Sequence, residues 1–135
     1  MTSFRFWVPG PLPGENEIIK ACRSRSYPRM KAKVTSDIIW NIKAAIPPKG
    51  LTRVRCAFEW VSADKRHDPD NIEAGQKFVW DALSAPRAGK PGAGVIPGDG
   101  WAQNAGSTHT HVIGPKPGVW VTVTDASNEG KADPC

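Results

Sequence analysis

Residues 52–61 carry the feature that most constrains the fold, a strict alternation that leads through polar residues into a helical pattern. The apolar side chains on one side fall at every second position, at Val54, Cys56, Phe58 and Trp60, and the other side includes Arg53, Arg55 and Glu59. Because successive side chains of a strand point to opposite faces, this pattern predicts a half-buried strand. After polar residues 62–71, apolar residues recur at helical spacing from Ile72 to Leu83. We therefore expect a strand that feeds directly into a helix.

Weaker patterns predict the remaining elements. Residues 4–8 alternate like a short strand and stop at Pro9-Gly10-Pro11. Residues 16–46 are mostly helical in pattern, with a break near Tyr27-Pro28 and a main helix over residues 31–46. Residues 108–113 and 119–124 predict the final strands. Between them, residues 84–94 are rich in Pro, Gly and Ala and predict a flexible basic loop.

The length of the chain indicates the number of domains, and its charge indicates the kind of partner. A chain of 135 residues suits one domain, which we place at residues 1–125, with residues 126–135 as a disordered tail. The net charge of +5 makes an acidic polymer a plausible partner. Residues 20–33 contain only basic charges, at Lys20, Arg23, Arg25, Arg29, Lys31 and Lys33. Such a run either binds phosphates or forms a solvated basic face, and composition leaves both open.

The cysteines and the hydropathy indicate a reducing, cytoplasmic location. Cys22, Cys56 and Cys135 have neither zinc-site nor disulfide spacing, so we expect free thiols. Cys56 lies on the apolar face of the predicted strand and is expected in the core. We find no apolar stretch long enough for a signal peptide or a membrane span, and expect no membrane partner.

Residues 67–71, His-Asp-Pro-Asp-Asn, join the predicted strand to the predicted helix. In an extended chain Asp68 and Asp70 point to the same side, and Pro69 favours extension at Asp68. Paired carboxylates with no pair of Cys or His residues nearby favour magnesium or manganese over zinc. A turn with a helix N-cap is the alternative explanation of the same residues, and without other support it is the commoner one. An EF-hand calcium loop is excluded, because Glu73 stands where such a loop needs Gly.

Two other residues are candidates for the same site. Glu73, Lys77 and Asp81 lie four positions apart on the predicted helix, so Lys77 lies on the side of Asp70. A salt-bridge ladder on a wet surface is the alternative. Asp99 is either a third metal ligand or an ordinary turn aspartate.

Aromatic and histidine side chains outside these motifs are expected to be mainly structural. Trp60 and Trp80 are expected in the core, whereas Trp101 either stacks on a base or closes its loop. His109 and His111 share a strand face without a third ligand, so we expect no metal there.

Four segments, in this order, resemble a known family: residues 9–17 (Pro-Gly-Pro-Leu-Pro-Gly-Glu-Asn-Glu), residues 66–71 (Arg-His-Asp-Pro-Asp-Asn), residues 77–83 (Lys-Phe-Val-Trp-Asp-Ala-Leu) and residues 95–101. Together they are similar to the RusA family of Holliday-junction resolvases, common in phages and prophages. The similarity covers residues 4–124.

The resemblance implies an α+β fold, with a small mixed β-sheet packed with two main helices, that forms a homodimer. It implies cleavage of branched DNA with magnesium, for which manganese is a substitute, and no small-molecule cofactor. Carried over, Asp68, Asp70 and Asp99 are the catalytic metal ligands and Lys77 is the catalytic lysine. Asn71 matches the asparagine that follows the aspartate pair.

Three departures from the family pattern accompany this resemblance. The interval from Asp70 to Lys77 is about one helical turn longer than in the best-known member, although a subgroup shares it. Gly98 replaces one of two acidic residues that many members have. The loop of residues 84–94 is several residues longer than usual.

The expected activity is magnesium-dependent resolution of Holliday junctions by paired symmetric nicks. A junction with near two-fold symmetry needs two cuts, which a dimer supplies. The expected DNA contacts are Lys20, Arg23, Arg25, Arg29, Lys31, Lys33, Arg66 and Asn71. The alternatives are a catalytically silent DNA-binding or assembly protein of the same fold, and a nuclease for flaps or forks.

Overall fold

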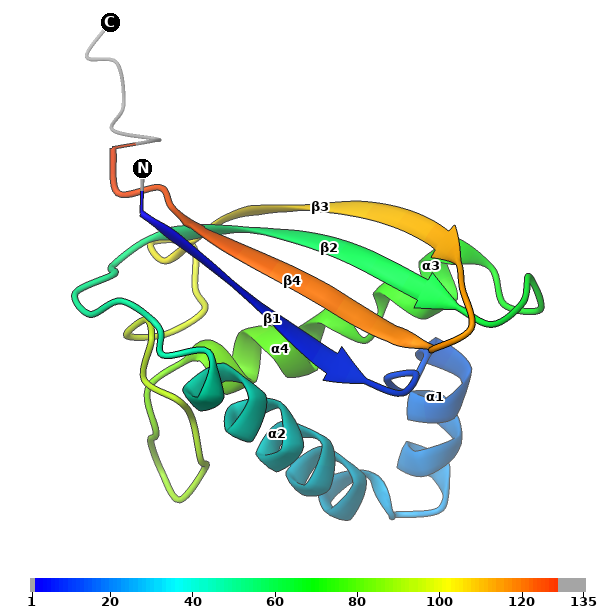
Figure 1. Cartoon of the computed structure of the whole chain (residues 1–135). Helices are drawn as coiled ribbons and strands as arrows, with labels where there is room; N and C mark the ends of the chain where they lie inside the picture. The colour runs from blue at the N-terminus through cyan, green and yellow to red at the C-terminus, as the bar shows by residue number, and fades with distance from the viewer. Residues whose placement is uncertain (1, 129–135) are drawn as a thin grey trace, which may run out of the picture.

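The centre of the structure is a four-stranded mixed sheet, shown in Figure 1. The computed structural model describes residues 2–128. The strands are β1 (Ser3–Pro9), β2 (Val54–Ser62), β3 (Asn104–Ile113) and β4 (Gly118–Asp125), in the order β1-β4-β2-β3. β4 is antiparallel to both of its neighbours, whereas β2 and β3 run parallel. The expected α+β class with a small mixed sheet is confirmed.

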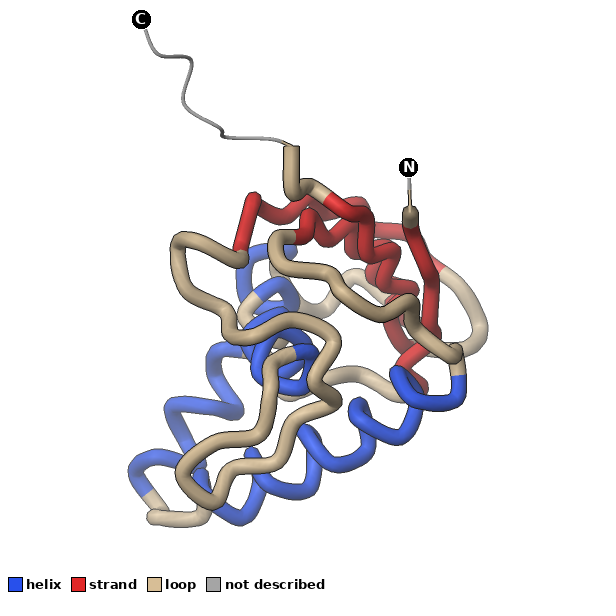
Figure 2. Tube along the Cα trace, turned by 90° about the vertical axis from the view of Figure 1, so that its left-hand side faces the viewer, coloured by secondary structure: helices blue, strands red, loops and turns tan. Residues whose placement is uncertain are grey.

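The helices cover one face of this sheet, as Figures 1 and 2 show. They are α1 (Glu15–Arg23), α2 (Tyr27–Ala44), α3 (Pro69–Glu73) and α4 (Gln76–Leu83). The alternating residues of β2 are buried beneath them as predicted, together with Val119, Val121 and Val123 of β4. Trp60 and Trp80 are both in this core, as expected. Burial of this one apolar face is what fixes the register of the strands.

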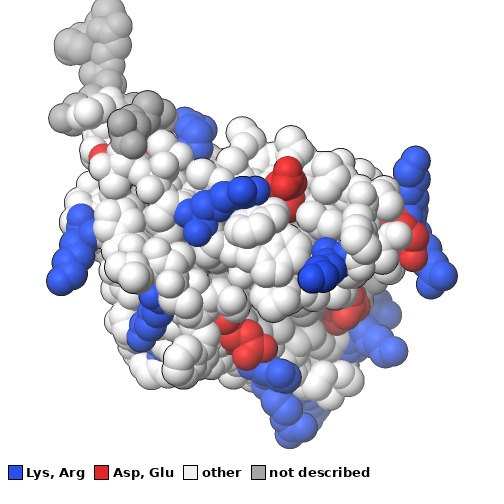
Figure 3. Space-filling model, in the orientation of Figure 1, with Lys and Arg blue, Asp and Glu red and all other residues white. Residues whose placement is uncertain are grey.

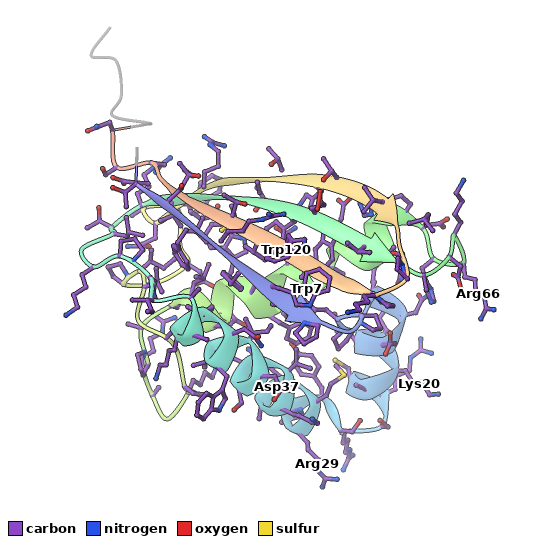
Figure 4. All side chains as sticks on the ribbon, viewed as in Figure 1. Trp7, Lys20, Arg29, Asp37, Arg66 and Trp120 are labelled. Atoms are coloured by element: carbon purple, nitrogen blue, oxygen red, sulfur yellow. The ribbon has the colours of Figure 1, made fainter. Side chains whose placement is uncertain are left out.

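The opposite face of the sheet carries the alternate side chains and is not covered by a helix. Figure 4 shows Trp7 and Trp120 side by side on this face. Their ring centroids are 5.2 Å apart. The guanidinium of Arg5 lies 4.1 Å from the Trp120 ring centroid and 3.7 Å from a Glu59 carboxylate oxygen. The face is therefore aromatic and basic at β1 and β4.

Helix α2 begins earlier than predicted. The break in the helical pattern falls at residues 24–26, where Arg25 takes a left-handed backbone conformation (φ 62°). Pro28 does not interrupt the helix but lies in its first turn. Proline is tolerated there because a helix has no internal acceptor for the N–H groups of its first turn.

The predicted helix of residues 72–83 is two short helices that begin earlier. Pro69 takes the first position of α3, where its fixed φ suits a helix start. Ala74 and Gly75 separate α3 from α4 but keep helical dihedrals, so the two helices follow one path. A Cβ on Gly75 would lie 2.9 Å from Cβ of Leu12, so only glycine allows this close packing.

Residues 84–96 form a defined arm rather than the expected flexible loop. Its end returns to α4, where the backbone N–H groups of Ala93 and Val95 donate to Ala82 and Leu83 (2.7 and 2.9 Å). Its tip is a two-residue hairpin in which Arg87 and Lys90 exchange backbone hydrogen bonds. Both central residues, Ala88 and Gly89, have positive φ, as a type I′ turn requires.

Strand β3 begins at Asn104, four residues before the predicted start. The register moves from Val54↔Asn104 to Cys56↔Ser107, so β3 has one extra residue opposite β2. Gly106, at φ 123°, accommodates this bulge. The alternation of side chains is disturbed there, which hid the start of the strand.

The folded region continues past Asp125. Ala126 is buried, and its N–H donates to the carbonyl of Arg53 at 2.9 Å. The first residue of the predicted tail therefore belongs to the fold, whereas residues 129–135 lie outside the described residues. Within residues 2–128, no helix is sufficiently long and apolar to cross a bilayer.

The two described cysteines should react very differently with thiol reagents. Cys22 is exposed, whereas Cys56 has no exposed surface and burial raises the pKa of its thiol. At neutral pH we expect iodoacetamide to modify Cys22 in the native protein and Cys56 only after unfolding in urea, as measured by peptide mass spectrometry. Equal modification of both residues in the native protein would contradict this packing.

Candidate active site

Asp68 and Asp70 lie at the start of α3, just beyond the carboxyl end of β2. Asp68 is the N-cap residue and has an extended backbone (φ −68°, ψ 149°), but Asp70 is already inside the first helical turn. The expectation that both project from one side of an extended chain is therefore wrong, because Pro69 starts the helix. Both side chains are exposed, and within residues 2–128 neither carboxylate joins an ion pair.

The capping interpretation fits these aspartates only in part. The Asp68 side chain makes no cap hydrogen bond, although its carbonyl accepts from Ile72 N–H at 3.2 Å. An Asp70 carboxylate oxygen accepts from the N–H of Asn71 at 3.1 Å. Most of the acceptor capacity of both carboxylates therefore faces solvent and is available to a ligand.

Asn71 serves a different helix. Its side-chain oxygen accepts a hydrogen bond from the N–H of Asn16, at the start of α1, at 3.0 Å. The N-cap residue of α1 is Gly14, which has no side chain to do this. A Cβ on Gly14 would lie 2.6 Å from the Asn71 amide nitrogen, so glycine is needed there. Asn71, a predicted DNA contact, is thus engaged in the fold.

Asp99 lies at the other end of the sheet from Asp68 and Asp70. Asp68 follows β2, and Asp99 precedes β3, whose first residue pairs with the first residue of β2. The nine residues of β2 span roughly 26 Å. Figure 1 shows α3 and the approach to β3, drawn in yellow, at opposite ends of the sheet. The three predicted ligands therefore do not meet within one chain.

Asp99 instead lies beside α4. Its carboxyl lies close enough to that of Asp81, in the last turn of α4, for the two groups to interact. Partial burial raises the pKa of Asp99, and the Asp81 carboxyl raises it further. Asp81 also pairs with Lys31 of α2, whose ammonium is 3.2 Å from a carboxylate oxygen.

Lys77 belongs to this second group. Its ammonium lies 5.2 Å from the ring centroid of Tyr27, whose hydroxyl raises the pKa of Lys77, with a smaller contribution from Asp81. Glu73 turns away and its carboxylate lies 2.6 Å from His111 Nε2. The alternative interpretation, a Glu73-Lys77-Asp81 ladder on the surface, is therefore wrong, because Glu73 and Asp81 each have a tertiary partner. Tyr27, Lys31, Lys77, Asp81 and Asp99 are named the α4 cluster below.

The predicted DNA-binding cations fall into two sets. Three have acidic partners: Lys31 with Asp81, Lys33 with Asp37 (3.6 Å) and Arg66 with Asp64 (3.2 Å). Four are exposed at the corner of α1 and α2: Lys20, Arg23, Arg25 and Arg29. Figure 4 shows Lys20 and Arg66 at the end of the molecule where α1 and α3 lie, and Arg29 at the lower edge beside the start of α2, and Figure 3 shows basic side chains at both places. Asp68 and Asp70 therefore have a basic neighbourhood.

The histidines of β3 have structural partners, as expected. Trp60 donates its indole N–H to His109 Nδ1 at 2.9 Å, and burial lowers the pKa of His109, which favours the neutral acceptor form. Trp101 has 96% of its surface exposed, so its ring does not close the loop.

The donors of a single chain fit the expected metal only in part. Within residues 2–128, no group of three or more His, Cys, Asp or Glu side chains is arranged to hold an ion. Magnesium is commonly held by one or two protein carboxylates, with waters and substrate phosphates completing its shell. Asp68 and Asp70 satisfy that minimum, whereas Asp99 does not join them.

Sequence reasoning missed Tyr27 and gave Asp81 only a surface role. The one available signal was the four-residue spacing from Lys77 to Asp81, since the contacts with α2 are tertiary. No family model matches this chain, and no curated protein does.

Replacing Asn71 should cost stability rather than DNA contacts. We expect Asn71→Ala to lose about 1 kcal/mol of unfolding free energy, because an N–H at the start of α1 loses its acceptor. Asn71→Asp keeps an acceptor oxygen and should stay close to the parent protein. Urea unfolding measures both, and unchanged stability with weaker DNA binding in Asn71→Ala would reverse this assignment.

Proposed function

We propose that this protein is a magnesium-dependent endonuclease that resolves Holliday junctions, acting as a homodimer. The observation that carries the proposal is the exposed Asp68 and Asp70 pair, which lacks cationic partners within residues 2–128 and lies at a basic end of the molecule. Carboxylates that face a polyanion weaken its binding, so a site that only binds DNA gains nothing from them.

The basic corner of α1 and α2 supports DNA as the substrate. Its exposed cations are close to α1, which packs against α3. Such cations position a phosphate backbone without reading its sequence. The proposed path of a strand is therefore across this corner toward the start of α3.

In the proposed reaction, a bound magnesium ion and side chains of this protein have separate roles. A magnesium ion held by Asp68 and Asp70 would polarise the scissile phosphate and lower the pKa of the attacking water. The ammonium of Lys77 has a raised pKa, so it stays protonated and supplies fixed positive charge. In one chain Lys77 interacts with Tyr27 and Asp81, and Asp99 lies at the other end of the sheet from Asp68 and Asp70.

Assembly of all four predicted catalytic residues therefore requires two chains. We propose that Asp99 and Lys77 of one copy act with Asp68 and Asp70 of the other. This arrangement makes dimer formation necessary for activity as well as for paired cutting.

A silent DNA-binding protein is the second candidate, favoured by the separation of Asp99 from Asp68 and Asp70. The silent DNA-binding protein is also favoured by two departures from the family pattern, Gly98 and the long arm of residues 84–96. The two candidates differ in one measurement, which is cleavage of DNA by the unmodified protein. A nuclease for flaps or forks would instead prefer those substrates over a junction.

Asp70→Asn should abolish cutting while binding is kept or tightened. The substitution removes a metal ligand and one negative charge that faces the DNA. The measurement compares nicking of a synthetic four-way junction with magnesium or manganese against a gel-shift titration without metal. Asp37→Asn, on the exposed side of α2, is the matched control and should cut normally. If the unmodified protein binds and never cuts, the silent-binder proposal replaces ours.

Mixing two inactive proteins should restore partial activity. In a dimer of one Asp70→Asn and one Asp99→Asn chain, a site shared between chains is intact once, so one strand is nicked. A site within a single chain stays broken in both copies. Co-expression of the two variants with different tags allows the mixed dimer to be isolated. If the mixed dimer fails to nick the junction although each variant alone binds it, a shared site is excluded.

A further inference from the structure

A cavity of about 440 Å³ lies between α2, the end of α4 and the arm of residues 84–96. Its polar lining comes from Tyr27, Lys31 and Thr35 of α2, Asp81 of α4, Arg87 of the arm, and Asp99. Small-molecule sites are usually cavities of this size with a few convergent polar groups. One wall of the cavity is Asp99, which the proposed function assigns to the shared metal site, but Thr35, Arg87 and Lys90 have no part in that chemistry.

Two buried hydroxyl groups line this cavity, and within residues 2–128 that of Thr35 has no hydrogen-bond partner, whereas that of Tyr27 interacts with the Lys77 ammonium. Thr35 is only 3% exposed, and its Oγ1 is buried without a partner. The hydroxyl oxygen of Tyr27 is also buried and lacks a bond of ordinary geometry. An unsatisfied buried hydroxyl destabilises the fold, so such a group usually has a ligand or water as its partner. A hydroxyl both donates and accepts, and therefore suits the mixed edge of a nucleobase.

The arm places cations at the rim. Arg87 and Lys90 are both exposed, flank the type I′ turn and are joined by two backbone hydrogen bonds (3.1 and 2.9 Å). A Cβ on Gly92 would lie 1.9 Å from the carbonyl oxygen of Ser84, so the arm packs against α4 in a way that only glycine permits. The two cations are thus held on a fixed element, which lowers the ordering cost of binding an anion.

The remaining walls are apolar and the charge balance is positive. Pro28, Ala32, Ala85, Pro91 and Pro97 supply surfaces suited to the faces of a planar ring. Lys31, Arg87 and Lys90 outnumber Asp81 and Asp99, and Lys31 already pairs with Asp81. A ligand with a flat polar ring and one anionic group matches these features together.

We propose that the cavity binds a nucleoside monophosphate unit. The base lies between the proline and alanine walls with its edge toward Thr35 and Tyr27, and the phosphate contacts Arg87 and Lys90. The unit is either a free nucleotide or a nucleotide turned out of a DNA strand. This nucleotide site adjoins the proposed catalytic group at Asp99 and so extends the proposed nuclease activity, but its test needs neither metal nor cleavage.

The test is calorimetric titration of the full chain with each of the four deoxynucleoside monophosphates, without divalent metal, with inorganic phosphate as the reference anion. We expect saturable binding of at least one nucleotide and weaker binding of inorganic phosphate. Arg87→Gln combined with Lys90→Gln should weaken nucleotide binding about tenfold or more. Thr35→Val should weaken it about fivefold, whereas Thr35→Ser, which keeps the hydroxyl, should bind normally.

Matched controls lie outside the cavity. Lys116→Gln removes an exposed cation in the turn between β3 and β4, and Thr122→Val removes a hydroxyl on the open face of β4. Neither should change the affinity. A short single-stranded oligonucleotide that competes with the nucleotide identifies a DNA strand as the source, and lack of competition identifies a free nucleotide.

Two results would overturn the proposal. One is the absence of saturable nucleotide binding, and the other is equal affinity for inorganic phosphate with no effect of Thr35→Val. Asp70→Asn protein should still bind the nucleotide, so a failure of the nuclease proposal is separable from a failure of this one.

Discussion

The parallel pairing of β2 with β3 is the constraint on which the rest of the structure depends. Parallel neighbours require a crossover that returns the chain to the starting end of the sheet. Here α3, α4 and the arm make that return over the face that buries the apolar residues of β2. As a result, side chains at the beginning of the crossover lie about one strand length away from those at its end. One acidic site lies beside α3, and another acidic group lies beside the last turn of α4.

Local patterns predicted the elements that local physics controls. The alternation of residues 54–60 and of residues 119–123 gave both central strands and their buried faces, because burial of one face demands period two. The helix starts were displaced, since Pro28 and Pro69 act as first-turn residues rather than as breaks. The arm was taken for a flexible loop, because its order comes from a hairpin with positive φ at Ala88 and from a close contact at Gly92. Composition alone does not encode these features.

The residues of the candidate site could be predicted from the sequence, but which of them lie close together could not. Asp68, Asp70, Lys77 and Asp99 were identified as separate motifs, but their assignment to one place assumed proximity. Strand direction decides that question, and no residue pattern states whether β3 runs parallel to β2. The role of Asn71 was hidden for a similar reason, because its partner Asn16 is 55 positions away. Tyr27 and Thr35 gained significance only when α2 packed on α4.

The hydrogen bond between Asn71 and the start of α1 shows that the segment of residues 67–71 contains residues needed for the fold as well as candidate catalytic residues. Pro69 and Asn71 serve the architecture, whereas Asp70 has no cationic partner within residues 2–128 and makes only one short-range hydrogen bond. Selection for a stable chain alone would preserve the first two and leave the third free to drift. A descendant that had lost catalysis would still display most of the signature. Among related sequences, the acidic position rather than the whole string would therefore separate enzymes from inert copies.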